Sequence, residues 1–297
     1  MTADAVAEFE AQRGRLFGLA YRLLGSAADA EDMVQDAFLR WHGADRAAIG
    51  SAPAWLARVV TNLCLNQLTS ARAQRVRYTG PWLPEPVLTE GGALGPLGTA
   101  AQRESVSLAL LVLLERLTPP ERAVFVLHEA FGYPYREIAD LLDLSEPHCR
   151  QLHRRARQRL ADGRARFRPP PADWRDLVEK FLVAAGTGDL PGLEKLLAED
   201  VTAWADGGGK VSAARRPVSG RDRVARYLAG LLHRYAAELQ ITLAEVNGAP
   251  AILAWQHGEL AGVLVAEFSG GQLTALRGVA NPDKLRFAAR QAAGLSR

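Results

Sequence analysis

The chain has 297 residues, of which 48% are hydrophobic and 23% charged, and its formal net charge is +3. This length suits two or three domains, each with its own core. The sequence contains no apolar run of membrane-spanning length and no charged-then-apolar leader, so it favours a soluble cytoplasmic protein, and we expect no membrane partner. Cys64 and Cys149 lack metal-ligand or CxxC spacing and are predicted to be buried thiols, and we expect no cofactor and no metal.

Charges are unevenly distributed along the chain. Eight arginines stand between Arg150 and Arg168 against the single acid Asp162, whereas four acids fall between Asp29 and Asp36. A helix rich in arginine suits the phosphate backbone of a nucleic acid, and an acidic helix suits a basic protein partner.

The first block is helical throughout, with helices predicted at 9–24, 29–42 and 53–70. In the second helix, Val34, Ala37, Phe38 and Trp41 form a buried stripe, and the acids project from the other side. An ordinary solvated face is an equally good interpretation of these acids. The third helix places Trp55, Arg58, Asn62 and Asn66 along one side, a combination suited to unstacked bases, although a plain surface helix also fits.

Two stretches rich in proline and glycine, at 73–101 and 163–171, divide the chain into three blocks. Between them, short helices are predicted at 108–117, 119–130, 135–142 and 146–160. Thr118, Pro119 and Glu121 form a capping box at the start of the second of these.

The last two helices of this block predict a helix-turn-helix. Ser145 caps the final helix, whose inward stripe is Cys149, Leu152, Ala156 and Leu160. A plain helical hairpin is the alternative, but the arginine density favours DNA binding. The outward face presents His148, Arg150, Gln151, Arg154 and Arg157.

In the third block, the hydrophobic pattern changes from helical spacing to a mixture of helical and alternating segments. Helices at 173–185, 190–198 and 221–234 accompany alternating segments at 201–205, 211–218, 238–246, 251–256, 260–268 and 272–279. This pattern predicts an α+β domain with a curved sheet against a helix layer.

These pieces, in this order, resemble the extracytoplasmic-function sigma factors of the sigma-70 family. The resemblance lies in residues 17–25, 29–38 and 55–62 for region 2 and in 117–124 with the helix-turn-helix for region 4. It implies region 2 at 5–72, an interdomain linker at 73–102, region 4 at 103–166 and a third domain at 172–290. The fold class is therefore two all-α sigma domains followed by an α+β domain.

The resemblance also implies partners, namely core RNA polymerase through its β′ and β subunits, and promoter DNA. The acidic helix would contact a coiled coil of β′ through Asp29, Asp32, Gln35 and Asp36. Asn62 and Asn66, beside Arg58 and with the loop 45–53, would hold a flipped base of the minus-ten strand. Arg150, Gln151 and Arg154 would read the minus-thirty-five duplex. One departure is Pro134, which stands where many relatives have a Ser or Thr cap.

The third block resembles the SnoaL-like branch of the NTF2-like cone fold, which a subgroup of these sigma factors carries. We hypothesise that it is a built-in regulator, that its glycine loop touches regions 2 and 4 or their linker, and that the tail after Asn281 supports a polymerase-competent geometry. Three strings carry this resemblance: Trp82, Leu83, Pro84, Glu85 and Pro86; Asp206, Gly207, Gly208, Gly209 and Lys210; and Asn281, Pro282, Asp283, Lys284 and Leu285.

Two other classes of function stay open. The third domain could bind a small molecule or catalyse proton transfer, with Asp206, Asp222, His233, Trp204 and His257 as candidates, but no nucleophile, metal or phosphate motif joins them, so we expect no catalytic residues. Alternatively, the chain could be a regulator that uses the helix-turn-helix alone. The acidic face at 29–36 favours the sigma interpretation.

Overall fold

The computed structural model describes residues 3–75, 78–90, 92, 94, 100–161, 174–235 and 238–295. The chain forms two compact units, Met1–Arg77 with Gly91–Phe167 and Tyr78–Glu90 with Arg168–Arg297. Two helical groups followed by an α+β domain confirm the predicted fold class. Within the described ranges, no helix is long and apolar enough to cross a membrane. The predicted second linker at 163–171, with Arg164, Arg166 and Arg168, lies outside the described residues.

The helical unit begins with three helices, α1 (Ala3–Leu24), α2 (Ala27–Gly43) and α3 (Ala52–Arg75), which we call the α1–α3 group. Ser26 caps α2, because its Oγ accepts the Asp29 N–H at 3.1 Å. The predicted stripe is confirmed at Val34, Ala37 and Trp41, which are buried. A single 3₁₀ turn, Arg46–Ala48, lies in the loop before α3.

Five shorter helices follow, and we call them the α4–α8 group. They are α4 (Ala100–Val106), α5 (Leu108–Leu114), α6 (Pro119–Glu129), α7 (Tyr135–Leu142) and α8 (Glu146–Ala161). The capping box of α6 is confirmed, with the Thr118 N–H donating to Glu121 Oε2 at 3.0 Å. Pro134 occupies the cap position of α7 and offers no side-chain bond. Helix α4 was not predicted.

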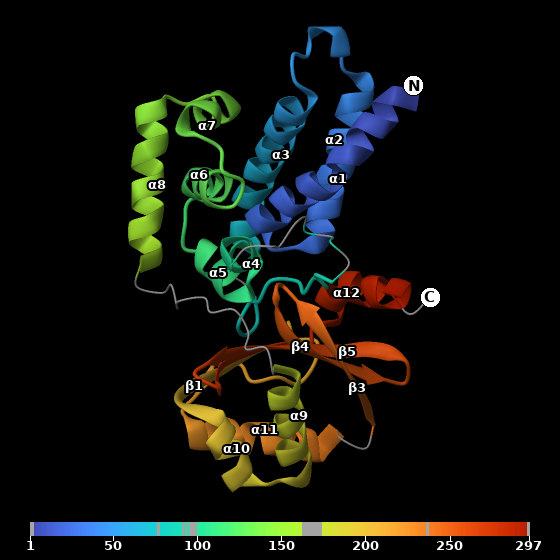
Figure 1. Cartoon of the computed structure of the whole chain (residues 1–297), viewed down its shortest axis with the longest axis vertical. Coiled ribbons are helices and arrows are strands. Elements are labelled where there is room, and N and C mark those ends of the chain that lie inside the picture. Colours follow the sequence, from blue (N-terminus) through green and yellow to red (C-terminus); the bar gives the residue numbers. More distant parts are fainter. Residues whose placement is uncertain are drawn as a thin grey trace. The chain divides into compact units, whose positions relative to one another are not determined.

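In the helical unit, α3 and α6 contact each other, and both contact α1 (Figure 1). Two buried arginines sit where the helix groups meet. Arg22 of α1 donates from Nε to Ser105 Oγ at 2.9 Å, and Arg122 of α6 pairs with Glu115 at 2.5 Å and donates from Nη2 to the Arg22 carbonyl at 3.5 Å. Burial lowers the pKa of Arg22 to about 10 and that of Arg122 to about 9. Cys64 and Cys149 are buried and unpaired with each other, as predicted.

The other unit is built on a six-stranded sheet in the order β2-β1-β6-β5-β4-β3, in which β1 runs parallel to β6 and the remaining neighbours are antiparallel. The predicted strand at 211–218 is wrong apart from its last residue, since Pro217 cannot donate to a ladder and two arginines precede it. The strands are β1 (Leu197–Asp206), β2 (Val218–Ser219), β3 (Leu239–Val246), β4 (Ala249–Gln256), β5 (Glu259–Ser269) and β6 (Gln272–Val279).

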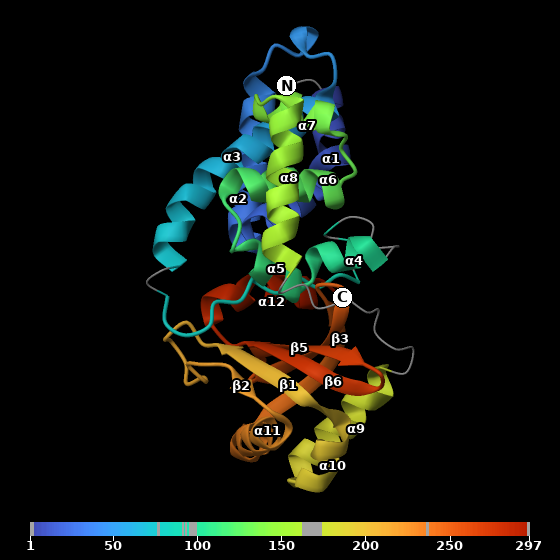
Figure 2. The same cartoon turned by 90° about the vertical axis from the view of Figure 1, so that its left-hand side faces the viewer.

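Helices cover both faces of this sheet (Figures 1 and 2). On one face lie α9 (Trp174–Thr187), α10 (Leu190–Leu196) and α11 (Arg221–Tyr235), and α12 (Pro282–Leu295) lies on the other. Alternate residues of β5 serve the two layers: Ala266 joins the core under α9–α11, whereas Val263 and Val265 are buried on the side of α12. The start of α12 coincides with the third string of the sequence.

Candidate nucleic-acid interface and linker-binding site

The outer face of α2 carries the predicted acidic residues. Asp32, Gln35 and Asp36 are exposed, and Asp29 is half-buried in the first turn. Leu39 follows them one turn later and is 58% exposed. Sequence reasoning missed this leucine, although an apolar residue outside the buried stripe was its signal. The face therefore offers negative charge around an apolar contact point, which suits a protein partner better than plain solvent.

Arg58, Asn62 and Asn66 lie exposed along one side of α3, four residues apart. Trp55 precedes them on the same side and is half-buried, with its ring 5.6 Å from that of Trp41. A cation, two amides and an aromatic edge thus form a continuous strip available to a nucleic-acid strand.

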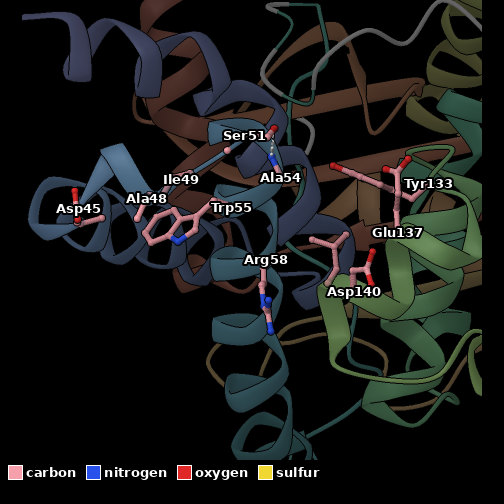
Figure 3. A pocket seen from close by; sticks show the side chains of 13 residues that line it. Asp45, Ala48, Ile49, Ser51, Ala54, Trp55, Arg58, Tyr133, Glu137 and Asp140 are labelled. Atoms are coloured by element: carbon pink, nitrogen blue, oxygen red, sulfur yellow. Dashed lines mark hydrogen bonds between the residues drawn. The ribbon is translucent and has the colours of Figure 1, made fainter.

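A cavity of about 600 Å³ opens at the N-terminal end of this strip. The loop 44–51, Trp55 and Arg58 form one wall (Figure 3). Glu137 and Asp140 of α7 lie on the other. A DNA strand lying against Arg58 in this arrangement would meet two carboxylates across the cavity, and their charge opposes that of the phosphates. The cavity as it stands does not favour DNA.

Helix α8 presents the predicted DNA-reading side chains. His148, Arg150, Gln151, Arg154 and Arg157 are all exposed, and the predicted inward stripe is confirmed as buried. Ser145 Oγ accepts the His148 N–H at 3.4 Å.

Arg150 is partly engaged within the protein, because it pairs with Glu146 at 2.5 Å and lies 5.4 Å from the centre of the Tyr135 ring. His153, which the sequence pattern assigned to neither face of this helix, is buried and only 4% exposed.

In the second unit, Asp206 and Lys284 bind the linker segment Tyr78–Glu90. We call Asp206, Asn281 and Lys284, together with Tyr78 of the segment, the linker clamp. The Asp206 carboxylate is fully buried and accepts four hydrogen bonds. Oδ1 accepts from the Tyr78 hydroxyl at 2.5 Å and the Gly208 N–H at 3.1 Å, and Oδ2 accepts from the Leu83 N–H at 2.8 Å and Lys284 Nζ at 2.7 Å.

Lys284 completes the clamp from α12. Its Nζ also donates to the Leu83 carbonyl at 2.6 Å and lies 4.5 Å and 4.4 Å from the ring centres of Tyr78 and Trp82. Asn281 Nδ2 donates to the Tyr78 hydroxyl at 2.8 Å. Burial, followed by the hydrogen bond to Asp206, raises the pKa of Tyr78. Both backbone polar groups of Leu83 are therefore bound to one buried ion pair.

The three glycines of the second string allow the loop to approach the linker. Gly208 has φ +58°, and a Cβ built there would lie 2.2 Å from Asn281 Nδ2 and 2.9 Å from the Tyr78 hydroxyl. Gly209 lies against Thr79, where a Cβ would come to 3.2 Å, and Lys210 pairs with Asp283. The glycine loop thus touches the linker, one of the places that we hypothesised for it.

The rest of the linker is bound by residues that the sequence did not single out. Asn247 is fully buried, and its Oδ1 accepts the Val87 N–H at 3.1 Å while its own N–H donates to the Val87 carbonyl at 2.9 Å. The side-chain amide of Gln291 in α12 binds both backbone groups of Leu88. Its Oε1 accepts the Leu88 N–H at 2.9 Å, and its Nε2 donates to the Leu88 carbonyl at 3.1 Å. The linker around these bonds is largely covered: Trp82 and Glu85 are half-buried, and the buried residues are Leu83, Pro84, Pro86, Val87 and Leu88. The remaining residues of the third string, Pro282 and Leu285, belong to α12, where Leu285 is buried.

A separate cavity of about 160 Å³ lies between the sheet and α9 and α11. Its lining is apolar apart from Ser212, Tyr227 and the indole of Trp204, and it contains no described carboxylate or imidazole. Leu231 and Ile241 line it and are 39% and 36% exposed.

Among the candidates for proton transfer, Trp204 alone lines this cavity within the described part of the chain. Asp206 is committed to the clamp, and Asp222 and His257 are exposed elsewhere. The side chain of His233 lies outside the described residues. Among the side chains that the structure describes, the cavity therefore has no placed acid or base of the kind that proton transfer requires.

Family comparisons agree with this architecture. The model of sigma-70 region 2 matches residues 9–74, and the model of sigma-70 region 4 matches residues 107–160. The chain is 41% identical over 290 residues to the ECF RNA polymerase sigma factor SigJ of Mycobacterium tuberculosis (strain ATCC 25618 / H37Rv), covering 94% of this chain and 92% of that protein.

Another relative and one solved structure extend the similarity. A probable ECF RNA polymerase sigma factor SigI of the same organism is 35% identical over 287 residues, with 94% of each chain covered. The crystal structure of the Mycobacterium tuberculosis extracytoplasmic function sigma factor SigJ matches with a TM-score of 0.74 at 38% identity, covering 95% of this chain and 98% of that one. The likeness therefore includes the C-terminal unit as well as the helices.

Proposed function

The chain belongs to the extracytoplasmic-function sigma factors, and from this premise we propose that its C-terminal domain regulates initiation by holding the linker between the two DNA-reading regions. As a sigma factor, the protein binds core RNA polymerase and directs promoter-specific transcription initiation, and it is not an enzyme. We place it in the cytoplasm, where its homologues act with the polymerase.

The acidic face of α2 is the proposed polymerase contact. Its negative charge around exposed Leu39 supports docking on the basic coiled coil of β′ that the family resemblance implies. Reversing Asp32 and Asp36 to Lys should abolish initiation by core enzyme while the fold is retained. The double reversal Glu199→Lys with Asp200→Lys, on exposed positions of β1, changes the charge equally and should leave initiation intact.

Promoter DNA is proposed to bind two surfaces. Arg58, Asn62 and Asn66 on α3 suit the melted minus-ten strand, and the exposed face of α8 suits the minus-thirty-five duplex, with Arg150, Gln151 and Arg154 reading bases and His148 and Arg157 beside them. Because Glu137 and Asp140 face Arg58 across a cavity, α7 must move away from α3 before a strand can lie there. Binding of DNA would then compete with the packing of the two helix groups.

Regulation by the C-terminal domain depends on one observation, which is that the buried Asp206–Lys284 pair binds both the N–H and the carbonyl of Leu83 in the linker. A held linker limits how far the two DNA-reading regions can move apart or turn. We infer that the clamp keeps the chain in a polymerase-competent geometry, so that its loss lowers initiation.

In vitro transcription with core polymerase tests this proposal. Full-length Lys284→Met, Gly208→Asp and a chain ending at residue 280 should each give less promoter-specific transcript than the wild type. Lys180→Met, on an exposed position of α9, removes one lysine without touching the clamp and should not change the yield. Unchanged or increased transcript from the clamp variants would contradict the proposed sign of regulation.

The apolar cavity supports a second role for the same domain, as the binding site of a small neutral molecule that acts on the clamp. An apolar cavity of about 150 Å³ is large enough for a single aromatic ring. Its walls include Ala205 and Ala280, the direct chain neighbours of the clamp residues Asp206 and Asn281. Thermal shift of the full chain with toluene should show stabilisation that Gly262→Leu abolishes, because a Cβ at Gly262 has room and would fill the cavity. Gly14→Leu, in open space on α1, is the control.

A further inference from the structure

Helices α6 and α8 bring together three potential metal ligands that neither DNA reading nor the clamp uses. One ligand atom each from His128, Glu129 and His153 lie within 4.8 Å of one another. His153 is buried, His128 is half-buried, and the Glu129 side chain is 32% exposed. The cluster therefore has a protected side and an opening to solvent.

The second nitrogen of each imidazole is already occupied. His128 Nδ1 lies 3.0 Å from the Tyr133 carbonyl, and His153 Nδ1 lies 2.8 Å from the Tyr135 hydroxyl. This leaves Nε2 of both rings, and His153 Nε2 is 2.9 Å from Glu129 Oε1. Histidines that bind metals are almost always oriented in this way by an outer hydrogen-bond partner.

We propose that His128 Nε2, His153 Nε2 and a Glu129 carboxylate oxygen bind a zinc ion, with water as the fourth ligand on the exposed side. Two imidazoles and one carboxylate form a familiar zinc ligand set. Bonds of about 2.0–2.1 Å in a tetrahedron place neighbouring ligand atoms roughly 3.4 Å apart. His153 Nε2 lies 2.9 Å from Glu129 Oε1, and one ligand atom from each of the three residues lies within 4.8 Å of the others, so side-chain rotations can bring the ligands to that spacing.

The hydrogen bonds of His153 also allow it to bind a cation. Without metal, His153 Nε2–H can donate to Glu129 while Nδ1 accepts from Tyr135. Zinc would take the Nε2 lone pair, the proton would move to Nδ1, and Nδ1–H would then donate to the Tyr135 hydroxyl oxygen. No net proton is released, although the positive charge of nearby Arg157 opposes the ion.

Such an ion would couple metal to promoter reading. It would join the end of α6 to the middle of α8, beside Tyr135 at the start of α7, and so fix the helix-turn-helix. Arg150 and Arg154 lie on the same helix as His153. This consequence depends on the proposed DNA-binding role of α8, whereas the metal site itself does not.

Cobalt is the probe for the site, because tetrahedral Co²⁺ has visible d–d absorption. Untagged full-length protein, stripped with chelator, should bind one equivalent and release it to zinc. His153→Ala and Glu129→Gln should weaken binding by at least ~10-fold, and Tyr135→Phe, which removes only the outer partner, by about 10-fold. His148→Ala, exposed on the same helix, should bind like the wild type.

Absence of the d–d bands, or equal binding by wild type and Glu129→Gln, would overturn the site. Glu129→Gln keeps the size of a partly exposed side chain, so it separates ligand loss from unfolding. In a second arm, zinc should change the affinity of the wild type for promoter duplex but not that of Glu129→Gln. Metal binding without this change would overturn the coupling alone, and a chain that binds no duplex with or without zinc would instead contradict the proposed role of α8.

Discussion

Both units bury cationic side chains, and Arg122 and Lys284 have very different surroundings. In the helical unit, Arg122 is 2% exposed, its Nε has no hydrogen-bond partner among the residues that the structure describes, and its ion-pair partner Glu115 keeps 23% of its side chain in solvent. In the C-terminal unit, Lys284 has a fully buried carboxylate, a carbonyl and two aromatic faces around its ammonium group.

The difference indicates which of the two sets of contacts is harder to break. A buried charge with incomplete partners is costly, and the lowered pKa of Arg122, to about 9, expresses that cost. A buried pair with every acceptor satisfied is difficult to break, because removal of one member leaves the other uncompensated. We therefore expect the junction of the helix groups to yield before the clamp does.

The largest effect should come from Lys284→Met. Asp206 would remain buried without its counter-ion, at a cost of about 3–5 kcal/mol in the unfolding free energy. Urea denaturation should show this loss, and Asp206→Asn combined with Lys284→Met should recover part of it. A loss as small as that of Lys180→Met would remove the distinction between the two cations.

A smaller loss is expected for Gly208→Ala. The left-handed conformation costs a non-glycine residue roughly 1–2 kcal/mol, and the new Cβ would also displace Asn281 from Tyr78. Gly270→Ala, which has a comparable φ of +61° but open space around it, separates backbone strain from the contact. Equal losses for the two variants would argue against a close fit between the glycine loop and the linker.

Tyr78 should make the clamp sensitive to high pH. Its pKa is raised in the folded state, so its contribution is present in full below the unfolded value of 10 and is lost as pH rises through the folded value. The difference in unfolding free energy between wild type and Tyr78→Phe should therefore be constant from pH 7 to 9 and shrink above pH 10. A difference that grows with pH would have the wrong sign.

Arg122→Met should have the smallest effect, less than about 1 kcal/mol in either direction, since the charge that burial disfavours disappears and Glu115 can return to water. The same denaturation series measures it. A loss as large as that of Lys284→Met would show that the helix groups are held as firmly as the linker.

Helical periodicity predicted most of the helical unit, since the stripes of α2 and α8 are read from spacing alone. Helical periodicity missed α4, which follows a run of proline and glycine. In the third block, the alternating pattern predicted a strand at 211–218, where Pro217 prevents one. Helical periodicity also missed the burial of His153, because a single stripe was assigned to a helix that α6 and α7 cover from two sides.

The three strings of the clamp were identified from the sequence, but Tyr78, Asn247 and Gln291, which also hold the linker, were not. Asn281 and Tyr78 are 203 positions apart, as are Gln291 and Leu88. Asn247 has φ +55°, and nothing in its neighbourhood indicates a linker contact. Contacts over such separations are set by strand order and helix placement, which local pattern does not encode.

The clamp also limits how far the segment between regions 2 and 4 can extend. The 24 residues between Arg75 and Ala100 could extend to roughly 80 Å as a free chain, whereas the nine residues after Glu90 reach only about 30 Å. Promoter elements at minus ten and minus thirty-five are about 25 base pairs apart, or on the order of 85 Å along the duplex. Because residues 78–90 are bound to the C-terminal domain, that domain becomes part of the connection between regions 2 and 4. The factor should therefore discriminate among promoters by the length of the spacer between their two elements.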